Sequence, residues 1–512
     1  MSKARIYARN LVANWIGYGA NLVVMFFLSP FVVHHLGNTT YGVWSLIMSL
    51  TGYLGLIEMG MRGGLGRFIN FHLGRDDIPK VNGVINTALM FFLLCGFPLF
   101  IVAGGLGAFF GNLFTKVPAE LIGSARLAVM LVALNLWLSF FSAAFKQILT
   151  AFERFDLTNA VNIGVLAVRA GGTVAVLLRG GGIVGLAAVQ VVSSLIGTLA
   201  VFVLAKRNFP KLQLHPRLAS KARFRELFGF GVWAFIGGIG MRLLYWTDLI
   251  VITVLLGPTM VTFYAVPLML IQHSRGLVSQ ISRVLVPQTI RASSVHDFEE
   301  LRFIFSWGSK IIMFLAIPLF VGMMFFGTEF IRLWMPWSEA ESRLSGNVLI
   351  LLAIPQLLVV ALWPGGGIIS GLGYVKFGAL MTLLQAIINL GLTLLFVMVM
   401  GLGLYGVALG TLVPSIAFNV VIAGFILRWI RFPVGKFVWD NVLRWCTMII
   451  AFGIICYGVF QILGNGRWLA FGLKVVALAA VSLPLGWYII FKGSEQRILR
   501  ERIMGIFSQV SA

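Results

Sequence analysis

The chain alternates long apolar segments with short polar ones. Crossing the roughly 30 Å hydrocarbon core of a membrane requires about 20 helical residues, and each apolar segment meets that length. Fourteen such segments lie near residues 10–34, 41–61, 83–110, 122–148, 158–178, 182–205, 226–256, 260–286, 303–327, 346–370, 377–400, 404–427, 442–463 and 469–491. The pattern therefore predicts an all-α integral membrane protein with about fourteen transmembrane helices.

Two halves of the chain resemble each other at a spacing of about 220 residues. At this spacing Gly37 in HHLGNTTYG aligns with Gly257 in VLLGPTMVTFYA, and Pro98 in GFPLF aligns with Pro318 in AIPLF. Each repeat contains six predicted helices, an even number, so both repeats begin on the same side of the membrane. This arrangement predicts two parallel six-helix bundles with a cavity between them.

The repeat also predicts how the chain is divided. We expect an N-terminal six-helix lobe at residues 1–210, a second six-helix lobe at 211–432, and an additional helix pair with a cytoplasmic tail at 433–512. Within segment 346–370, Pro364 precedes three glycines. Because proline removes a backbone donor, we expect a bend there.

Composition and charge agree with a membrane location. The 512 residues are 59% hydrophobic and 11% charged, with a net charge of +22. Of the 39 Lys and Arg residues, 29 fall on the side of the membrane that carries both termini, which predicts cytoplasmic termini. The basic segment 206–225 then lies beside anionic lipid head groups, and a nucleic-acid partner is not expected.

Several chemistries are not supported. Cys95, Cys446 and Cys456 lie in apolar segments without metal-ligand spacing, and the six histidines are scattered, so we expect no metal site and no cofactor. The longest outer segment carries Glu329 beside Glu339 and Glu341 without a catalytic motif. We interpret these three carboxylates as solvated charges and expect a protein that is not an enzyme.

A few charged residues lie inside the predicted helices, where each costs about 2.5 to 3.5 kcal/mol and therefore usually faces the bundle interior or water. The candidates are Glu58, Arg126, Arg169, Arg242 and Asp248. Arg169 and Arg242 fall near the membrane midplane, so we expect both to line a cavity. Guanidinium groups bind phosphate and carboxylate through paired hydrogen bonds, so such a cavity favours an anionic ligand.

Alternative interpretations stay open for the other charges. Glu58 and Arg62 are four residues apart, so an ion pair at the membrane interface explains them equally well. Arg126 lies near the outer boundary and can extend its charge into water. Arg242 and Asp248 are six residues apart, which places them on different faces of one helix, so each needs another partner.

Residues 36–69, LGNTTYGVWSLIMSLTGYLGLIEMGMRGGLGRFI, resemble the O-antigen flippase branch of the multidrug/oligosaccharidyl-lipid/polysaccharide (MOP) exporter superfamily. DLIVITVLLG, FYAVPLML and FGTEFIRLWM also stand where that family has similar segments. The resemblance implies two six-helix bundles like those of multidrug exporters of the MATE type, with an extra helix pair. It also implies a bacterial inner-membrane flippase that moves an undecaprenyl-diphosphate-linked saccharide to the outer leaflet by alternating access.

On this hypothesis Arg169 and Arg242 bind the diphosphate and acidic sugars, and Arg126 guides exit. Asp248 and Glu58 either pair with the arginines or bind a coupling cation. Partners implied are the lipid-linked saccharide, membrane lipids, and glycan polymerase and chain-length machinery. Two alternatives stay open, a cation-coupled multidrug exporter of the same superfamily and a membrane scaffold of glycan assembly that transports nothing.

Overall fold

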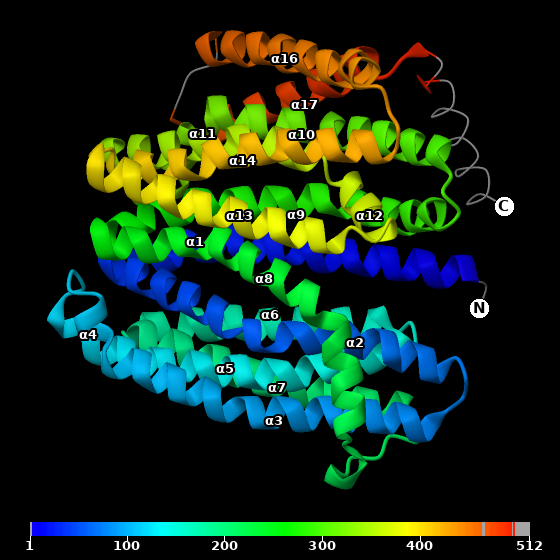
Figure 1. The fold of residues 1–512 in the computed structure, drawn as a ribbon. Coiled ribbons are helices and arrows are strands. Elements are labelled where there is room, and N and C mark those ends of the chain that lie inside the picture. Colours follow the sequence, from blue (N-terminus) through cyan, green and yellow to red (C-terminus); the bar gives the residue numbers. More distant parts are fainter. Residues whose placement is uncertain (1–2, 463–465, 494, 497–512) are drawn as a thin grey trace. The chain divides into compact units, whose positions relative to one another are not determined.

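The protein is helical throughout its described part. The computed structural model describes residues 3–462, 466–493 and 495–496, and the described side chains exclude those of 3–15, 57, 59, 60, 62, 63, 229–234, 283 and 284. These residues form helices and no strand (Figure 1). The predicted all-α class is therefore confirmed, whereas the alternative pairing of Glu58 with Arg62 involves a side chain outside the described residues.

The chain divides into two compact units. Unit 1 contains Met1–Ala265 and Thr382–Leu390. Its helices are α1 (Lys3–Leu54), α2 (Leu56–Leu73), α3 (Ile78–Ala108), α4 (Phe110–Leu113), α5 (Ala119–Ala151), α6 (Phe155–Leu178), α7 (Gly182–Asn208), a 3₁₀ turn (Pro216–Leu218) and α8 (Lys221–Leu255). Helix α8 packs against α1 and α2, so unit 1 extends past the predicted lobe boundary at residue 210. The division into three parts stays a prediction.

Unit 2 contains Val266–Met381 and Gly391–Ala512. Its helices are α9 (Pro258–Ser294), α10 (Phe298–Trp334), α11 (Glu339–Ala361), α12 (Pro364–Gly371), α13 (Val375–Leu394), a π-helical turn (Leu395–Val399), α14 (Gly403–Trp429), α15 (Val434–Phe437), a second π-helical turn (Val438–Val442), α16 (Leu443–Ile462) and α17 (Trp468–Ile490). The start of α9 and the middle of α13 are counted with unit 1. The predicted segment 346–370 is interrupted before Pro364, as expected from its missing backbone donor.

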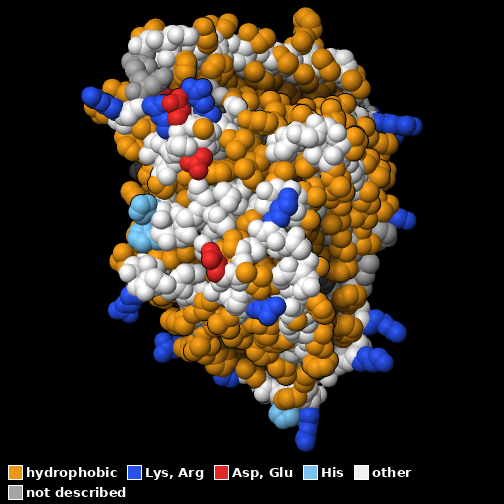
Figure 2. Space-filling view, turned by 90° about the vertical axis from the view of Figure 1, so that its left-hand side faces the viewer, with side chains coloured by type: hydrophobic (Ala, Val, Ile, Leu, Met, Phe, Trp, Pro, Cys, Tyr) orange, Lys and Arg blue, Asp and Glu red, His pale blue; other side chains and the backbone are white. Residues whose placement is uncertain are grey.

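Twelve helices of the described residues are long and apolar enough to cross a membrane. The difference from fourteen arises at two places. Segments 10–34 and 41–61 belong largely to one helix, α1, which bends at Gly37 with φ 73°. Segment 260–286 lies in α9, whose polar side chains, among them His273, Arg275 and Gln280, lower its hydropathy. Figure 2 shows hydrophobic side chains over most of the visible surface, with few carboxylates among them.

The internal repeat is visible in the backbone. Residues in the left-handed region recur about 220 positions apart, in the pairs Gly37 and Gly257, Asp76 and His296, Glu153 and Gly373, Gly180 and Gly401, and Gly182 and Gly403. Asp77 and Asp297, also 220 apart, both cap the helix that follows by accepting a backbone N–H. The same turns at the same spacing show that the two repeats share one fold.

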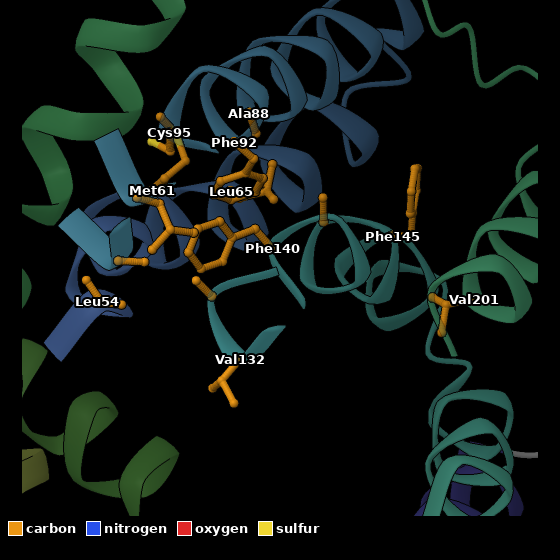
Figure 3. Packing of buried hydrophobic residues seen from close by; sticks show 14 of the residues in the cluster. Leu54, Met61, Leu65, Ala88, Phe92, Cys95, Val132, Phe140, Phe145 and Val201 are labelled. Atoms are coloured by element: carbon orange, nitrogen blue, oxygen red, sulfur yellow. The ribbon is translucent and has the colours of Figure 1, made fainter. Parts of the chain in front are cut away.

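Large apolar side chains fill the centre of unit 1. Met61 and Leu65 of α2, Phe92 of α3 and Phe140 of α5 are almost completely buried. Figure 3 shows the ring of Phe140 among them, and the Phe92 and Phe140 ring centroids are 5.7 Å apart. These contacts fix α5 against α2 and α3, so α5 presents its remaining faces to α6 and α7.

In unit 2, an ion pair buried from solvent joins α17 to α10. Lys474 Nζ donates to Glu329 Oε2 at 2.8 Å and to Oε1 at 3.1 Å, and Lys474 is 0% exposed. The interpretation of Glu329 as a solvated charge is therefore wrong. Sequence proximity to Glu339 and Glu341 was misleading, because Glu329 still lies inside α10 while the other two start α11.

Candidate functional site

Arg169 lies on α6, in unit 1, and is only partly buried. Its Nε atom is buried and has no hydrogen-bond partner among the described residues. A buried guanidinium N–H group without a partner is costly, so water or a ligand is expected to complete its hydrogen bonds.

A polar pocket of about 310 Å³ surrounds this side chain. It is lined by Asn21 of α1, Ser139, Ser142, Ala143 and Lys146 of α5, Val161, Asn162, Val165, Leu166 and Arg169 of α6, and Ser194, Gly197 and Thr198 of α7. The polar residues recur at intervals of three, four and seven, so each helix turns one polar face toward the pocket. Its volume lies at the lower end of the range for small-molecule sites.

The pocket is positively charged. Lys146 and Arg169 line it, and the described residues of its lining include no Asp or Glu. Lys146 Nζ donates to Asn162 Oδ1 at 2.8 Å. Ser194 Oγ donates to Asn135 Oδ1 at 2.5 Å, which fixes α7 against α5. Two cations among neutral donors and acceptors suit an anion that also carries hydroxyl groups.

Arg242 does not line this pocket. It lies half-buried on α8, where it interacts electrostatically with Glu58 at the start of α2. Its Cζ atom is 5.9 Å from the centroid of the Trp246 ring. The structure thus brings together Arg242 and Glu58, two of the predicted site residues, and places Arg169 in a separate pocket of unit 1.

Asp248 occupies a third environment. It is 3% exposed, and the Tyr264 hydroxyl donates to its Oδ2 atom at 2.5 Å. The residue directly before it, Thr247, shares a 2.5 Å hydrogen bond with the Tyr53 hydroxyl. Asp248 and Arg242 therefore have different partners, in agreement with their six-residue spacing.

Arg126 lies near the start of α5 and is exposed. Its Nη2 atom donates to the carbonyl oxygen of Ala108, the last residue of α3, at 3.2 Å. This contact satisfies a free carbonyl at a helix C-terminus and places a positive charge at the negative end of the helix dipole. A role in binding stays a prediction for this residue.

Unit 2 contains a cavity of opposite character. It measures about 410 Å³. Its lining consists of Leu270, Phe314, Leu315, Pro318, Leu319, Gly322, Met323, Phe326, Gly327, Phe330, Leu349, Phe452, Phe471, Val475, Leu478, Ala479, Ser482 and Leu483. Apart from Ser482 these side chains are apolar, so the cavity suits a hydrocarbon chain.

Sequence reasoning missed most of the polar pocket. It found Arg169 but did not connect Lys146, Asn162, Ser142 or Ser194 with it. The available signal was weak, namely polar residues at helical spacing on α5, α6 and α7. Serine and asparagine side chains also form hydrogen bonds with the backbone of their own helix, so this signal alone does not distinguish a site from ordinary packing.

Comparison with solved structures agrees with the fold. The lipid II flippase MurJ in an inward closed conformation has a TM-score of 0.71 at 16% identity, over 93% of this chain and 97% of that one. An inward-facing multidrug-resistance transporter of the MATE family has a TM-score of 0.70 at 15% identity, over 80% of this chain and 94% of that one. The MATE-like arrangement of two helix bundles expected from the sequence is thus confirmed, and the chain is a multi-pass membrane protein.

Comparison of sequences identifies the family. A protein of Shigella flexneri named "Putative O-antigen transporter" is 24% identical over 434 residues, which cover 82% of this chain and 97% of that protein. Residues 7–293, more than half of the chain, match the family described as "Polysaccharide biosynthesis protein". The chain belongs to this polysaccharide biosynthesis family.

Proposed function

We propose that this protein is a flippase that moves an undecaprenyl-diphosphate-linked saccharide from the cytoplasmic to the outer leaflet of a bacterial inner membrane. The observation that carries the proposal is the positively charged pocket around Arg169 inside an apolar helical bundle. A membrane protein hides such charges at considerable cost unless a ligand or water uses them. A lipid-linked saccharide offers the matching groups, which are phosphate oxygens and sugar hydroxyls.

In this proposal the polar pocket binds part of the head group. Arg169 contacts an anionic oxygen, and Lys146 adds a second positive charge to the same pocket. The hydroxyl and amide groups of Ser142, Ser194 and Asn162 bind sugar hydroxyls. The pocket has room for a phosphate or a single sugar, not for a whole oligosaccharide, so the rest of the glycan lies outside it.

The apolar cavity of unit 2 binds part of the isoprenoid chain. Its phenylalanine, leucine and methionine side chains offer dispersion contacts to a branched hydrocarbon. The two cavities thus match the two chemical halves of one amphipathic substrate, which neither a multidrug exporter of cations nor a scaffold without transport requires.

The remaining candidates have secondary roles. Arg242 and Glu58 form a charge pair. A passing diphosphate takes the place of Glu58 beside Arg242, or a coupling cation takes the place of Arg242 beside Glu58. Asp248 accepts a hydrogen bond from the Tyr264 hydroxyl. In this proposal it stabilises α8 six residues after Arg242. Arg126 lies at the outer end of α5. Its role in guiding the exit of the substrate stays a prediction. Glycan polymerase and chain-length proteins are the partners that such a reaction needs.

Purified protein in liposomes tests the proposal. Lipid-linked saccharides with a diphosphate, with a monophosphate and with an uncharged linkage are placed in one leaflet, and their arrival in the other is followed by an impermeant reagent. We expect the diphosphate to move fastest and the uncharged lipid slowest. Liposomes without protein correct for spontaneous movement. Equal rates for all three lipids, or transport of a lipophilic cation in their place, would contradict the proposal.

A further inference from the structure

A chain of hydrogen bonds inside unit 1 ends at Ser194, a residue of the polar pocket. Gln190 Nε2 donates to the sulfur atom of Met48 at 3.7 Å. Asn135 Nδ2 donates to Gln190 Oε1 at 3.4 Å, and Ser194 Oγ donates to Asn135 Oδ1 at 2.5 Å. The chain therefore connects side chains of α1, α7 and α5 to the lining of the pocket.

The sulfur atom sets the direction of every bond in this chain. A thioether has no hydrogen to donate, so the part of Gln190 beside Met48 is its NH₂ group. The Gln190 oxygen then faces Asn135 and requires the Asn135 NH₂ group. The Asn135 oxygen in turn faces Ser194, so the single hydroxyl hydrogen of Ser194 is used inside the protein. Toward the pocket Ser194 is left with lone pairs, and it acts there as an acceptor.

Two more hydroxyl groups of the pocket also donate to the protein. Ser139 Oγ donates to the carbonyl oxygen of Leu136 at 2.6 Å, and Thr198 Oγ1 donates to that of Leu138 at 3.3 Å. Because a hydroxyl group has one hydrogen, both oxygens are acceptors toward a ligand, as the Ser194 oxygen is. Two of these three acceptors, Ser194 and Thr198, lie about one turn apart on α7.

Helix α6 presents donors to the same pocket. Lysine has no acceptor, so Lys146 Nζ bonds the oxygen of Asn162 at 2.8 Å and leaves the Asn162 N–H groups as donors. Arg169, about two turns further along α6, carries donors alone. An ionised phosphate or carboxylate accepts from these groups, but it has no hydrogen for the acceptors on α7. A ligand that satisfies both helices therefore carries an anionic group together with hydroxyl or amide N–H groups.

We propose that Met48, Gln190 and Asn135 are positioning residues that hold Ser194 as an acceptor, so that the pocket selects a sugar ring with a free hydroxyl group near an anionic group. The inference rests on the proposed flippase function and names the part of the head group that this pocket recognises. The anionic group is either the phosphate of the lipid linkage or the carboxylate of an acidic sugar. A methyl ether in place of the hydroxyl group has no hydrogen for Ser194, so it is disfavoured.

Methylated lipids test this selection in liposomes. Diphosphate-linked glucose and diphosphate-linked glucuronic acid are each prepared with free hydroxyl groups and with one hydroxyl at a time converted to a methyl ether. An impermeant pyrophosphatase, which cleaves the linkage and does not read the ring hydroxyls, follows their arrival in the other leaflet. For one hydroxyl position we expect the free sugar to move about two- to tenfold faster than its ether. This preference with both sugars identifies the phosphate as the anionic group, and with glucuronic acid alone it identifies the carboxylate. The same rate for every ether and its free sugar would overturn the selection.

Variants outside the pocket test the positioning residues. Asn135→Leu releases the Ser194 hydrogen, which can then bond the ether oxygen, and Met48→Leu removes the atom that fixes the direction of the chain. We expect both variants to lose most of the preference for the free sugar, whereas a merely structural defect slows the sugar and its ether equally. Met130→Leu is the control, because Met130 packs against the same apolar core as Met48, and it should keep the wild-type preference. An unchanged preference in Asn135→Leu, or equal preferences in Met48→Leu and Met130→Leu, would overturn the assignment.

Thermal unfolding in detergent tests the hydrogen-bond chain without any substrate. Ser194→Ala and Asn135→Leu each break the bond between these two residues, so their falls in Tm should be less than additive in the double variant. The control combines Asn135→Leu with Thr150→Ala, whose hydroxyl donates to the carbonyl oxygen of Lys146 at 2.9 Å, and its falls should be additive. Additive falls in both pairs would overturn the chain whatever lipid is transported. This result therefore separates failure of the inference from failure of the proposed function.

Discussion

Arg169 in unit 1 and Lys474 in unit 2 are both cations inside apolar helices, yet their surroundings differ. Lys474 is enclosed, bonded to both carboxylate oxygens of Glu329, and its Nζ atom lies 5.7 Å from the centroid of the Phe326 ring. Among the described residues, the lining of the pocket that Arg169 faces has no carboxylate, and the Arg169 Nε atom has no hydrogen-bond partner. The first charge holds two helices together, and the second, we propose, binds a ligand.

The difference shows that a charge inside a span is not by itself a sign of function. Both residues are costly to insert, and the cost is offset in unit 2 by a protein partner and in unit 1, we propose, by the substrate. The two units also share a repeated backbone, with left-handed turns at equivalent positions. A duplicated fold thus supports one polar and one apolar cavity, since function depends on the side chains placed on it.

The largest effect is expected from breaking the enclosed pair. Lys474→Ala leaves Glu329 buried without its cation, so we expect a loss of about 3 to 5 kcal/mol in the free energy of unfolding, measured by thermal or denaturant unfolding in detergent. The double variant Lys474→Met with Glu329→Gln removes both charges and should recover most of that loss. If the double variant is no more stable than the single one, Lys474 does not act through Glu329.

Arg169→Ala should affect transport and leave stability unchanged. Losing a charged hydrogen-bonding partner of the substrate costs about 2 to 5 kcal/mol, so we expect transport of the diphosphate-linked lipid to fall by about 30-fold or more. Unfolding should be unaffected, because no described hydrogen bond of Arg169 is lost. Arg179→Ala, at the exposed end of the same helix, is the control. Equal transport by both variants would exclude Arg169 from the site.

A smaller effect is expected from filling the apolar cavity. Gly322 lines it, and a Cβ atom added there meets nothing within 4 Å. Gly322→Leu therefore occupies the space intended for the isoprenoid chain without moving the backbone, and we expect transport to fall by about tenfold, as for about 1.4 kcal/mol of lost binding. Gly458→Leu on α16, also in open space but outside the cavity, should be neutral. Shortening the isoprenoid should remove the difference between the two variants.

The sequence predicts the fold well because long apolar segments and repeated turn residues are local signals. The left-handed glycines, Gly37 and Gly257, were already aligned from the sequence, and the structure gives both of them positive φ. The number of membrane spans is predicted less well, because α1 merges two apolar segments and α9 is too polar to count as a candidate span. Periodicity counts apolar residues and does not detect where a helix continues.

The candidate site is less predictable, because partners come from helices far apart in the chain. Arg169 is visible as an isolated charge, but Lys146 and Ser194 join its pocket only when α5, α6 and α7 pack together. Likewise nothing near Glu329 in the sequence identifies Lys474, 145 residues away. Whether a charge is enclosed by protein or faces a cavity is decided by tertiary packing, which local patterns do not contain.

The smallest predicted effect compares one hydroxyl group in each cavity. Ser142 lines the polar pocket, whereas Ser482 lines the apolar cavity and donates to the carbonyl oxygen of Ala479 in its own helix. A neutral hydrogen bond contributes about 0.5 to 1.5 kcal/mol, so Ser142→Ala should lower transport by about two- to tenfold if the hydroxyl binds a sugar. Ser482→Ala should have no effect, because a hydrocarbon chain makes no hydrogen bond there. Initial flipping rates in liposomes at limiting substrate measure both variants. Equal sensitivity of the two would mean that the cavities do not divide the head group and the chain between them.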